Sequence, residues 1–370
     1  MSAQRLALLL AVSTRAFGET RDIIYVPGKT GLAAGSGARA QTLRALKATG
    51  LKPGSFLSTT VYMTDAGLLP EVDRGYRDFF RKGFPARTVL VAGLRTPGAL
   101  IEISATGTGR GGARRVCYTG THAAGLPPAA PPGSASPESA ACEAAGSLYL
   151  SALRPVEAGT GRTIPATAIE AQAEQVMKNQ ETVLRAAGFS FSDLVLSKIY
   201  LAEPTAYAGL NEVYRRFVSA PPPARATIHA RPVRPGELLQ IQSIAVRGSG
   251  AGRPSGEGRT SPIHSYSVKA GRRLYITGMT GRAPDGRFKP DISGQTRQAM
   301  RTIDEQLRHH DMGFRNVVET TIWLRDLGDF EGMSAVYQEL VRAGTEALTV
   351  VQIPPTSIEA LVEIQMIAEK

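Results

Sequence analysis

The chain has 370 residues, of which 42% are hydrophobic and 20% are charged, so it can bury cores for two or three domains of about 150 residues. Its two cysteines, Cys117 and Cys142, exclude a disulfide scaffold and a cysteine-based zinc cluster, and its five histidines show no metal-binding spacing. The net charge of +11 fits an anionic partner, and because no run of five basic residues occurs, a small carboxylate fits better than nucleic acid.

The apolar stretch from Leu6 to Val12 is too short to span a bilayer. No cleavage site typical of a signal peptide follows it before Arg15. The stretch therefore predicts a first β-strand, in a cytoplasmic protein without a membrane partner.

One order of elements then occurs three times along the chain, which is the pattern of an internal repeat. Each copy opens with a hairpin, clearest over Ser265–Met279, and continues with a helix that has apolar residues at helical spacing. These first helices are predicted over Ala38–Thr49, Ile169–Ala187 and Ile292–His310. Strand-like runs that end in an acid follow them, over Phe56–Asp65, Leu194–Glu203 and Val317–Asp326.

A second helix and two strands close each copy. The second helices carry a tyrosine at matching places, which are Tyr76, Tyr214 and Tyr337. The strand pairs are predicted over Arg87–Leu94 with Leu100–Thr106, Arg225–Val233 with Leu238–Val246, and Leu348–Ile353 with Leu361–Ala368. The order is therefore ββαβαββ in each of three domains.

The three predicted domains cover residues 1–107, 115–247 and 263–370. Glycine-rich, basic segments join them, and their composition is typical of flexible linkers. Residues 126–139, rich in proline, alanine and serine, interrupt the second domain and predict a mobile insertion.

Two copies carry the same pair of motifs. Pro85-Ala86-Arg87 precedes an Ile-Glu-Ile strand at residues 101–103, and Pro223-Ala224-Arg225 precedes Gln-Ile-Gln at residues 240–242. With these motifs each copy resembles a domain of the reactive intermediate deaminase family, known as Rid or YjgF. The resemblance implies an α+β fold of chorismate-mutase type, with three domains forming an intramolecular pseudo-trimer that has clefts between neighbours. It also implies a monomeric protein that needs no cofactor.

The resemblance assigns the central role to the residue after Pro-Ala. Its guanidinium would bind a substrate carboxylate through two parallel hydrogen bonds. The three copies have Arg87, Arg225 and Leu348 at this place. Since leucine cannot make these bonds, no more than two clefts can bind a carboxylate in this way.

Three further positions complete the implied site. An acid fifteen residues later orients water and moves protons, and the copies have Glu102, Gln240 and Glu363 there. The position three residues before the second-helix tyrosine, often asparagine in the family, holds Asp73, Asn211 and Ser334. A small hydroxyl in the opening hairpin is Ser151 or Thr277, where the first copy has Pro27-Gly28. An aromatic before that hairpin is His264 or Tyr266 in the third copy, and a lone histidine there is more often structural.

The leading functional prediction is hydrolytic deamination of a 2-imino acid to a 2-oxo acid. Arg87 or Arg225 would hold the carboxylate, and water near Glu102 would attack the imine carbon.

Fusion with divergent clefts also fits a specialised biosynthetic enzyme that condenses, cyclises or hydrolyses a reactive nitrogen-containing intermediate. The lost arginine and acid fit a non-catalytic ligand-binding scaffold. A ribonuclease ranks last, because no histidine pair or acidic cluster has nuclease spacing. The order of the copies around a ring stays open.

Overall fold

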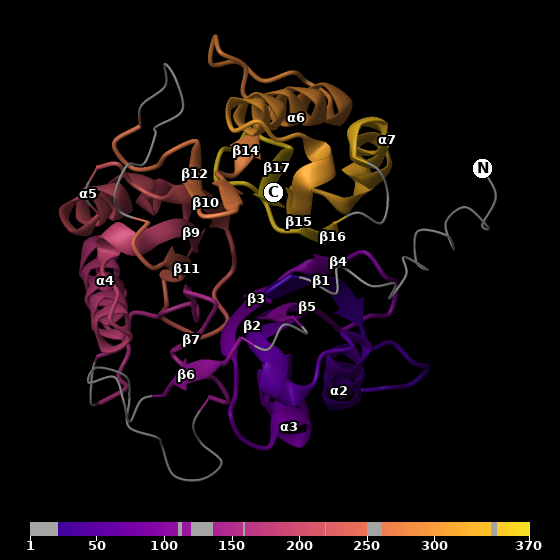
Figure 1. The fold of residues 1–370 in the computed structure, drawn as a ribbon. Coiled ribbons are helices and arrows are strands. Elements are labelled where there is room, and N and C mark those ends of the chain that lie inside the picture. Colours follow the sequence, from indigo (N-terminus) through magenta and orange to yellow (C-terminus); the bar gives the residue numbers. More distant parts are fainter. Residues whose placement is uncertain are drawn as a thin grey trace.

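The computed structural model describes residues 21–109, 113–119, 136–157, 160–218, 220–249, 261–341 and 346–370. These residues form an α+β fold with three sheets, each accompanied by two helices (Figure 1). We call the three groups unit 1 (residues 21–109), unit 2 (113–249) and unit 3 (261–370). Within the described part of the chain, no helix is long and apolar enough to cross a membrane.

Unit 1 contains a four-stranded sheet in the order β1-β5-β2-β3. Strands β2 and β3 run parallel, and β5 pairs antiparallel with both β1 and β2. Its elements are β1 (Ile23–Thr30), α2 (Ala38–Ala48), β2 (Phe56–Met63), α3 (Leu69–Phe80), β3 (Ala86–Val91) and β5 (Ile101–Thr108).

Unit 2 repeats this pattern in a six-stranded sheet of order β10-β9-β11-β8-β7-β6. The extra strands β6 and β7 are joined by a disulfide between Cys117 and Cys142, a pairing that the sequence analysis did not foresee. Its elements are β6 (Val116–Tyr118), β7 (Ala141–Ala144), β8 (Ser147–Leu150), α4 (Ile169–Ala186), β9 (Leu194–Leu201), α5 (Tyr207–Phe217), β10 (Ala224–His229) and β11 (Leu239–Val246).

Unit 3 contributes the main sheet path β12-β13-β17-β15-β16, with β14 paired to β17. At its edge, β16 pairs with β4 (Gly93–Leu94), which comes from unit 1. The elements of unit 3 are β12 (Ser267–Ala270), β13 (Arg273–Ile276), β14 (Met279–Thr280), α6 (Ile292–His309), β15 (Val317–Leu324), α7 (Phe330–Leu340), β16 (Ala347–Gln352) and β17 (Val362–Glu369).

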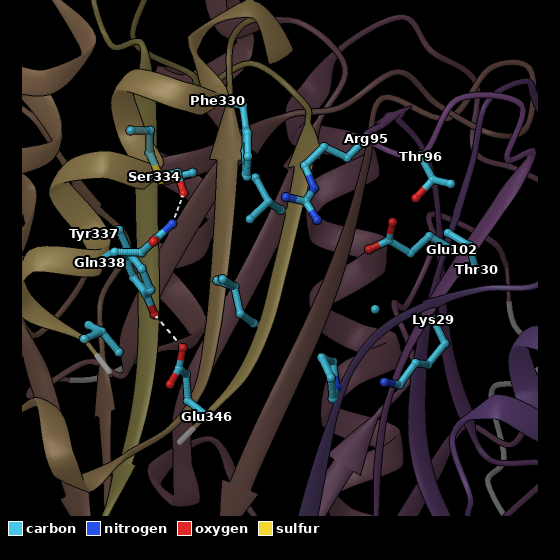
Figure 2. A pocket seen from close by; sticks show the side chains of 16 residues that line it. Lys29, Thr30, Arg95, Thr96, Glu102, Phe330, Ser334, Tyr337, Gln338 and Glu346 are labelled. Atoms are coloured by element: carbon cyan, nitrogen blue, oxygen red, sulfur yellow. Dashed lines mark hydrogen bonds between the residues drawn. The ribbon is translucent and has the colours of Figure 1, made fainter. Parts of the chain in front are cut away.

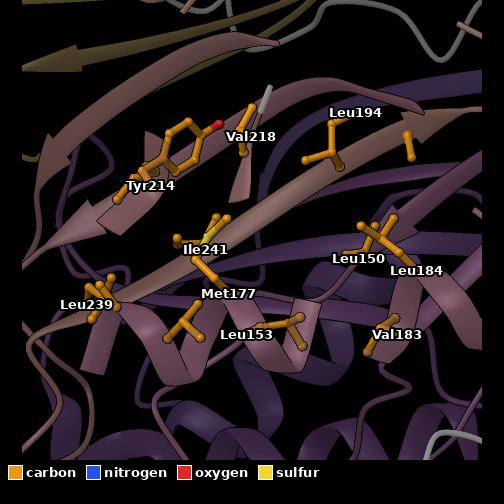
Figure 3. Close-up of a cluster of buried hydrophobic side chains, with 14 of the residues drawn as sticks. Leu150, Leu153, Met177, Val183, Leu184, Leu194, Tyr214, Val218, Leu239 and Ile241 are labelled. Atoms are coloured by element: carbon orange, nitrogen blue, oxygen red, sulfur yellow. The ribbon is translucent and has the colours of Figure 1, made fainter. Parts of the chain in front are cut away.

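Amphipathic helices supply each unit with its own core. In unit 2, Met177, Val183 and Leu184 of α4 pack with Leu194 of β9 and Ile241 of β11 (Figure 3). Such residues recur at three- and four-residue spacing, so one face of the helix is apolar and the other is polar. The sequence pattern alone therefore fixes which face of each helix meets its sheet.

The three predicted first helices are confirmed to within one residue at their ends. Two predicted strands are wrong at their ends. The run Arg87–Leu94 is interrupted after Val91, because Gly93 and Leu94 leave unit 1 to pair with unit 3. The predicted strand Arg225–Val233 ends at His229, whose backbone N–H donates to the Pro354 carbonyl of unit 3. The predicted strand Leu6–Val12 and residues 126–135 of the insertion lie outside the described residues.

Strand register shows that the aligned positions are structurally equivalent. In the three parallel strand pairs, Arg87 lies opposite Thr59, Arg225 opposite Ser197, and Leu348 opposite Thr320. The second-helix tyrosines bond to these opposite residues, as Tyr76 with Thr59, Tyr214 with Ser197 and Tyr337 with Thr320. Each tyrosine thus ties its helix to the strand beside the arginine position.

Contacts join the three units into a closed ring. Unit 2 donates from the Ser139 N–H to the Pro85 carbonyl of unit 1, and unit 3 donates from the Ser265 N–H to the Pro223 carbonyl of unit 2. Unit 1 meets unit 3 through the β4–β16 pair. A buried apolar cluster where the sheets meet draws on all three units and includes Leu90, Ile228 and Val351.

Candidate functional site: three unequal clefts

The ring order decides which residues meet. We name each cleft by the unit that gives the arginine position and then by its neighbour. The 1–2 cleft holds Arg87, the 2–3 cleft Arg225 and the 3–1 cleft Leu348. The backbone N–H groups of Ala152 and Gly278 donate to the carbonyls of Arg87 and Arg225, and each is contributed by the following unit.

The 2–3 cleft holds a cavity of about 840 Å³, which is larger than the cavity of about 310 Å³ in the 3–1 cleft. Arg225 and Tyr207 of unit 2 line it, together with His264, Thr277 and Glu363 of unit 3. It is the only one of the three clefts in which the structure brings the predicted arginine, acid and hydroxyl together.

Arg225 is held in place from its backbone and from Nε, which leaves its outer nitrogens free. Its N–H donates to Thr277 Oγ1 at 2.9 Å, and its Nε donates to Thr227 Oγ1 at 2.9 Å. The guanidinium carbon lies 4.9 Å from the Tyr214 ring centroid and 5.5 Å from that of Tyr207. Nη1 and Nη2 are buried and have no hydrogen-bond partner among the described residues. Burial lowers the pKa of Arg225, while the two tyrosines and Glu363 act in the opposite direction. A buried cation with two unused donors suits a carboxylate ligand.

Glu363 on β17 is buried in the same cleft. Burial raises its pKa to about 8, although a hydrogen bond from the Thr227 backbone and the charge of Arg225 act to lower it. The side chain lies over Gly278, where an added Cβ would meet Glu363 Oε1 at only 2.0 Å. Glycine is therefore needed here so that the carboxyl group can approach the backbone.

Two further predicted residues of this cleft serve the arginine indirectly. Thr277 Oγ1 donates to the Ser265 carbonyl while it accepts from Arg225, so the hydroxyl fixes the position of the arginine backbone. Asn211 lies one turn before Tyr214 on α5, and its Oδ1 is buried without a partner among the described residues. Unlike the aspartate at the equivalent place in unit 1, it carries no charge that would neutralise Arg225. His264 is neutral at pH 7, because burial and then Arg225 lower its pKa to about 4.

The 1–2 cleft differs because its arginine is already paired. Arg87 Nη1 donates to Asp73 Oδ1 at 2.7 Å, Nε to Glu138 Oε2 at 3.2 Å, and Nη2 to Ser136 Oγ at 2.8 Å. Its side chain is 0% exposed. Although burial alone would raise the pKa of Glu138, the charges of Arg87, Arg154 and Arg234 lower it, so Glu138 is ionised. The end of the predicted insertion therefore places carboxylate and hydroxyl oxygens where a substrate carboxylate would bind.

The remaining residues of the 1–2 cleft also point to structural roles. Gln240 Nε2 donates to the Val89 carbonyl at 3.0 Å, across the boundary between the units. Ala152 stands where the other two clefts have Gly278 and Gly28. The 1–2 cleft has no acid at the equivalent of Glu363, so no carboxyl group needs to approach the backbone here. Ser151 Oγ accepts from the Arg87 N–H and donates to the Ser139 carbonyl, just as Thr277 does in the 2–3 cleft.

The 3–1 cleft combines Leu348 and Ser334 of unit 3 with Glu102 of unit 1 (Figure 2). Glu102 therefore lies in the cleft without the predicted arginine, and the expected pairing of water at Glu102 with Arg87 or Arg225 is wrong. Burial raises the pKa of Glu102 to about 7, while Arg95 acts to lower it. The side chain lies over Gly28, where an added Cβ would meet its Oε1 at only 1.9 Å.

The sequence analysis missed several residues that shape the clefts. Glu138 follows a proline-rich stretch that gave no sign of an inward-facing carboxylate. Tyr207 lies seven residues, about two helical turns, before Tyr214 in α5, and this spacing, which places both rings on one helix face, was a usable signal in the sequence. In the part of the chain that the structure describes, no group of three His, Cys, Asp or Glu could hold a metal ion.

Comparisons with known proteins agree with this architecture. The family model described as endoribonuclease L-PSP matches residues 129–247 and 257–370. The RutC family protein y4sK of Sinorhizobium fredii is 34% identical over 113 residues, which cover 30% of this chain and 89% of that protein. The 2-iminobutanoate/2-iminopropanoate deaminase of Mus musculus is 29% identical over 117 residues, 32% of this chain and 86% of the relative. A solved chorismatase structure has a TM-score of 0.55 at 14% identity, covering 94% of this chain and 97% of that one, and shows the same overall fold.

Proposed function

The chain belongs to the endoribonuclease L-PSP family as a Rid protein with tandem domains, and from this we propose that it hydrolyses a 2-imino acid in the 2–3 cleft. The observation that carries the proposal is Arg225, which lines the same cavity as Glu363 and whose two buried Nη groups have no hydrogen-bond partner among the described residues. The deaminase activity named for the mouse relative supports the choice of substrate class.

Each residue has a defined task in the proposed reaction. Arg225 binds the carboxylate of the imino acid through Nη1 and Nη2, which holds the imine carbon beside Glu363. The protonated Glu363 carboxyl gives its proton to the imine nitrogen, and the resulting carboxylate takes a proton from the water that attacks the imine carbon. The same carboxyl then protonates the amine, the C–N bond breaks and ammonia leaves. The hydroxyl gives its proton back to the Glu363 carboxylate, which yields the 2-oxo acid and restores the protonated carboxyl.

The direct test follows the imino acid itself. An amino-acid oxidase generates it, and semicarbazide traps what has not been hydrolysed. We expect the protein to reduce semicarbazone formation in proportion to its concentration. Unchanged trapping in the presence of the wild-type chain would reject this function.

The pH dependence of the reaction should reveal the carboxyl group. Because the pKa of Glu363 is raised to about 8, the proton donor is present at neutral pH and is lost as the pH rises through this value. We expect kcat/KM to be level below about pH 8 and to fall above it. Glu363→Gln should lower the rate and abolish this fall, while Glu359→Gln, at an exposed position, should keep it. A wild-type profile without an ionisation between about pH 7 and 9 would contradict the assignment.

A second candidate is a reaction of a larger carboxylate. The observation that favours it is the 840 Å³ cavity, which lies toward the upper end of the roughly 300–1,000 Å³ typical of small-molecule sites and exceeds the need of a four-carbon imino acid. We propose to test chorismate and large cyclic imines beside small imino acids, because the similar solved structure is named a chorismatase. Turnover of one of these compounds without turnover of small imino acids would favour this candidate.

The ring of contacts also supports a proposal about assembly. We propose that one chain is a self-contained pseudo-trimer that acts as a monomer. The mass in solution tests it, since a mass near three chains would contradict it.

A further inference from the structure

The 3–1 cleft encloses a separate cavity of about 310 Å³ whose two walls differ in chemistry. Unit 1 supplies charged side chains, and unit 3 supplies mostly apolar ones. Figure 2 shows Lys29, Arg95 and Glu102 on one side of the cavity and Phe330 and Tyr337 on the other. No role in the proposed reaction falls to this cavity.

Two cations of unit 1, Lys29 and Arg95, line this cavity, and Glu102 of the same wall is close enough for the charge of Arg95 to act on its pKa. The Arg95 guanidinium lies over the Phe330 ring, 4.3 Å from its centroid. Lys29 is half-buried on β1, and burial lowers its pKa. Within the described residues, neither side chain has a carboxylate oxygen within 4.0 Å or a side-chain hydrogen bond. The wall therefore presents two positive charges, one on the half-buried Lys29 and one on the exposed Arg95, which are open to an anion.

Among the residues that line the cavity, the facing wall of unit 3 supplies no cation. Leu348 takes the place that an arginine occupies in the other two clefts. The polar side chains of this wall bond to protein groups: the Tyr337 hydroxyl bonds to Thr320 at 3.0 Å and to Glu346 at 3.3 Å, and Gln338 Nε2 donates to Ser334 Oγ at 2.6 Å. The apolar part of the wall is formed by Phe330, Met333, Val341, Leu348 and Val350.

We propose that the 3–1 cleft binds a small, flat carboxylate such as an aromatic acid, with its carboxylate toward Arg95 and Lys29 and its ring against Phe330 and Leu348. In the 3–1 cleft the cations come from unit 1, the second unit of the cleft's name. In the 2–3 cleft the cation Arg225 comes from unit 2, the first unit, so the bound carboxylate would face the opposite wall. A cavity of 310 Å³ lies at the lower end of the roughly 300–1,000 Å³ of small-molecule sites, which fits a single ring. The site does not depend on the reaction proposed for the other cleft.

Glu102 gives this site a dependence on pH. The groups around it are Arg95 and Lys29 of unit 1, with Tyr337 and Glu346 of unit 3 on the facing wall. Its pKa of about 7 means that it carries a proton in a large share of molecules at neutral pH. Protonation removes a negative charge beside the bound carboxylate, so binding is tighter at pH 6 than at pH 8 and takes up a proton.

Calorimetric titration of the full chain with benzoate tests the site. Arg225→Ala serves as the background, because it removes the arginine of the 2–3 cleft. In this background we expect one equivalent of benzoate to bind. Adding Arg95→Gln and Lys29→Met should weaken binding at least tenfold, while adding Arg185→Ala, at an exposed arginine of α4, should not change it. The neutral analogue benzamide should bind at least tenfold more weakly than benzoate.

Two results would overturn the proposal. One is the absence of benzoate binding in the Arg225→Ala background while the unfolding midpoint is that of the wild type. The other is equal benzoate affinity with and without Arg95→Gln and Lys29→Met. The imine-trapping assay is a separate measurement, so a failure of either idea leaves the other testable.

Discussion

Arg225→Ala should lower kcat/KM for a 2-imino acid by roughly 10²- to 10⁴-fold. The substitution removes two charge-assisted hydrogen bonds to the substrate carboxylate, each of about 1.5–3 kcal/mol, and about 1.4 kcal/mol corresponds to a factor of ten. The semicarbazide assay measures the effect. Arg225→Lys should recover only part of it, because an ammonium group cannot form two parallel hydrogen bonds.

The same substitution should leave stability nearly unchanged. The Nη groups of Arg225 have no protein partner among the described residues, so alanine removes the desolvation cost of these buried donors. This gain offsets the loss of the Nε hydrogen bond to Thr227 and of the contacts with the Tyr214 and Tyr207 rings. Arg185→Ala is the control for loss of an arginine, since its ion pair with Glu181 is exposed. Activity of Arg225→Ala within twofold of the wild type would reject the assignment of the cleft.

Arg87→Ala should lower the stability of the fold and leave the proposed activity in place. Because Arg87 is fully buried between Asp73 and Glu138, its loss leaves two carboxylates without their cation. Breaking a buried ion pair in this way costs about 3–5 kcal/mol, which should appear as a clear drop in the urea midpoint of unfolding. The folded protein should keep its imine hydrolysis, because the 2–3 cleft contains no part of this cluster.

A variant with three substitutions separates the effect of charge from that of packing on the stability loss of Arg87→Ala. If the stability loss comes from unpaired carboxylates, Asp73→Asn and Glu138→Gln should recover part of it when added to Arg87→Ala. The lowered pKa of Glu138 means that its ion pair stabilises the fold above the unfolded-state pKa of about 4.3 and that this stabilisation is lost as the pH falls. The difference in the free energy of unfolding between the wild type and Arg87→Ala should therefore become smaller at acid pH. Arg87→Ala with wild-type stability and no activity would place the reaction in the 1–2 cleft instead.

The repeat made much of the fold predictable. Helix limits followed from local patterns such as the apolar spacing along Ile292–His310, and the structure adds an Asp291 cap, which accepts from the Gly294 N–H at 2.7 Å. The equivalence of Arg87, Arg225 and Leu348 also followed from aligned motifs, because matching strands impose a matching register.

The composition of each cleft could not be predicted in the same way. It depends on which unit follows which around the ring, and this order is set by contacts between distant residues such as Gly93 and Gln352. The Arg87–Glu138 pair spans 51 positions and involves an irregular segment without periodicity. The cations Lys29 and Arg95 belong to unit 1 but face unit 3, so only the assembled chain gives them a shared cavity.

The short β4–β16 pair, which closes the ring between the first and third units, has a consequence for how such a protein can change. The RutC family protein and the mouse deaminase match over about one unit of this chain, whereas in an assembly of identical one-unit chains every substitution would appear in all sites at once. In this chain each substitution appears once. The 2–3 cleft can keep an arginine without an internal partner, and the arginine of the 1–2 cleft can pair with internal carboxylates. The 3–1 cleft can have leucine at the same place. None of these changes is copied into the other clefts.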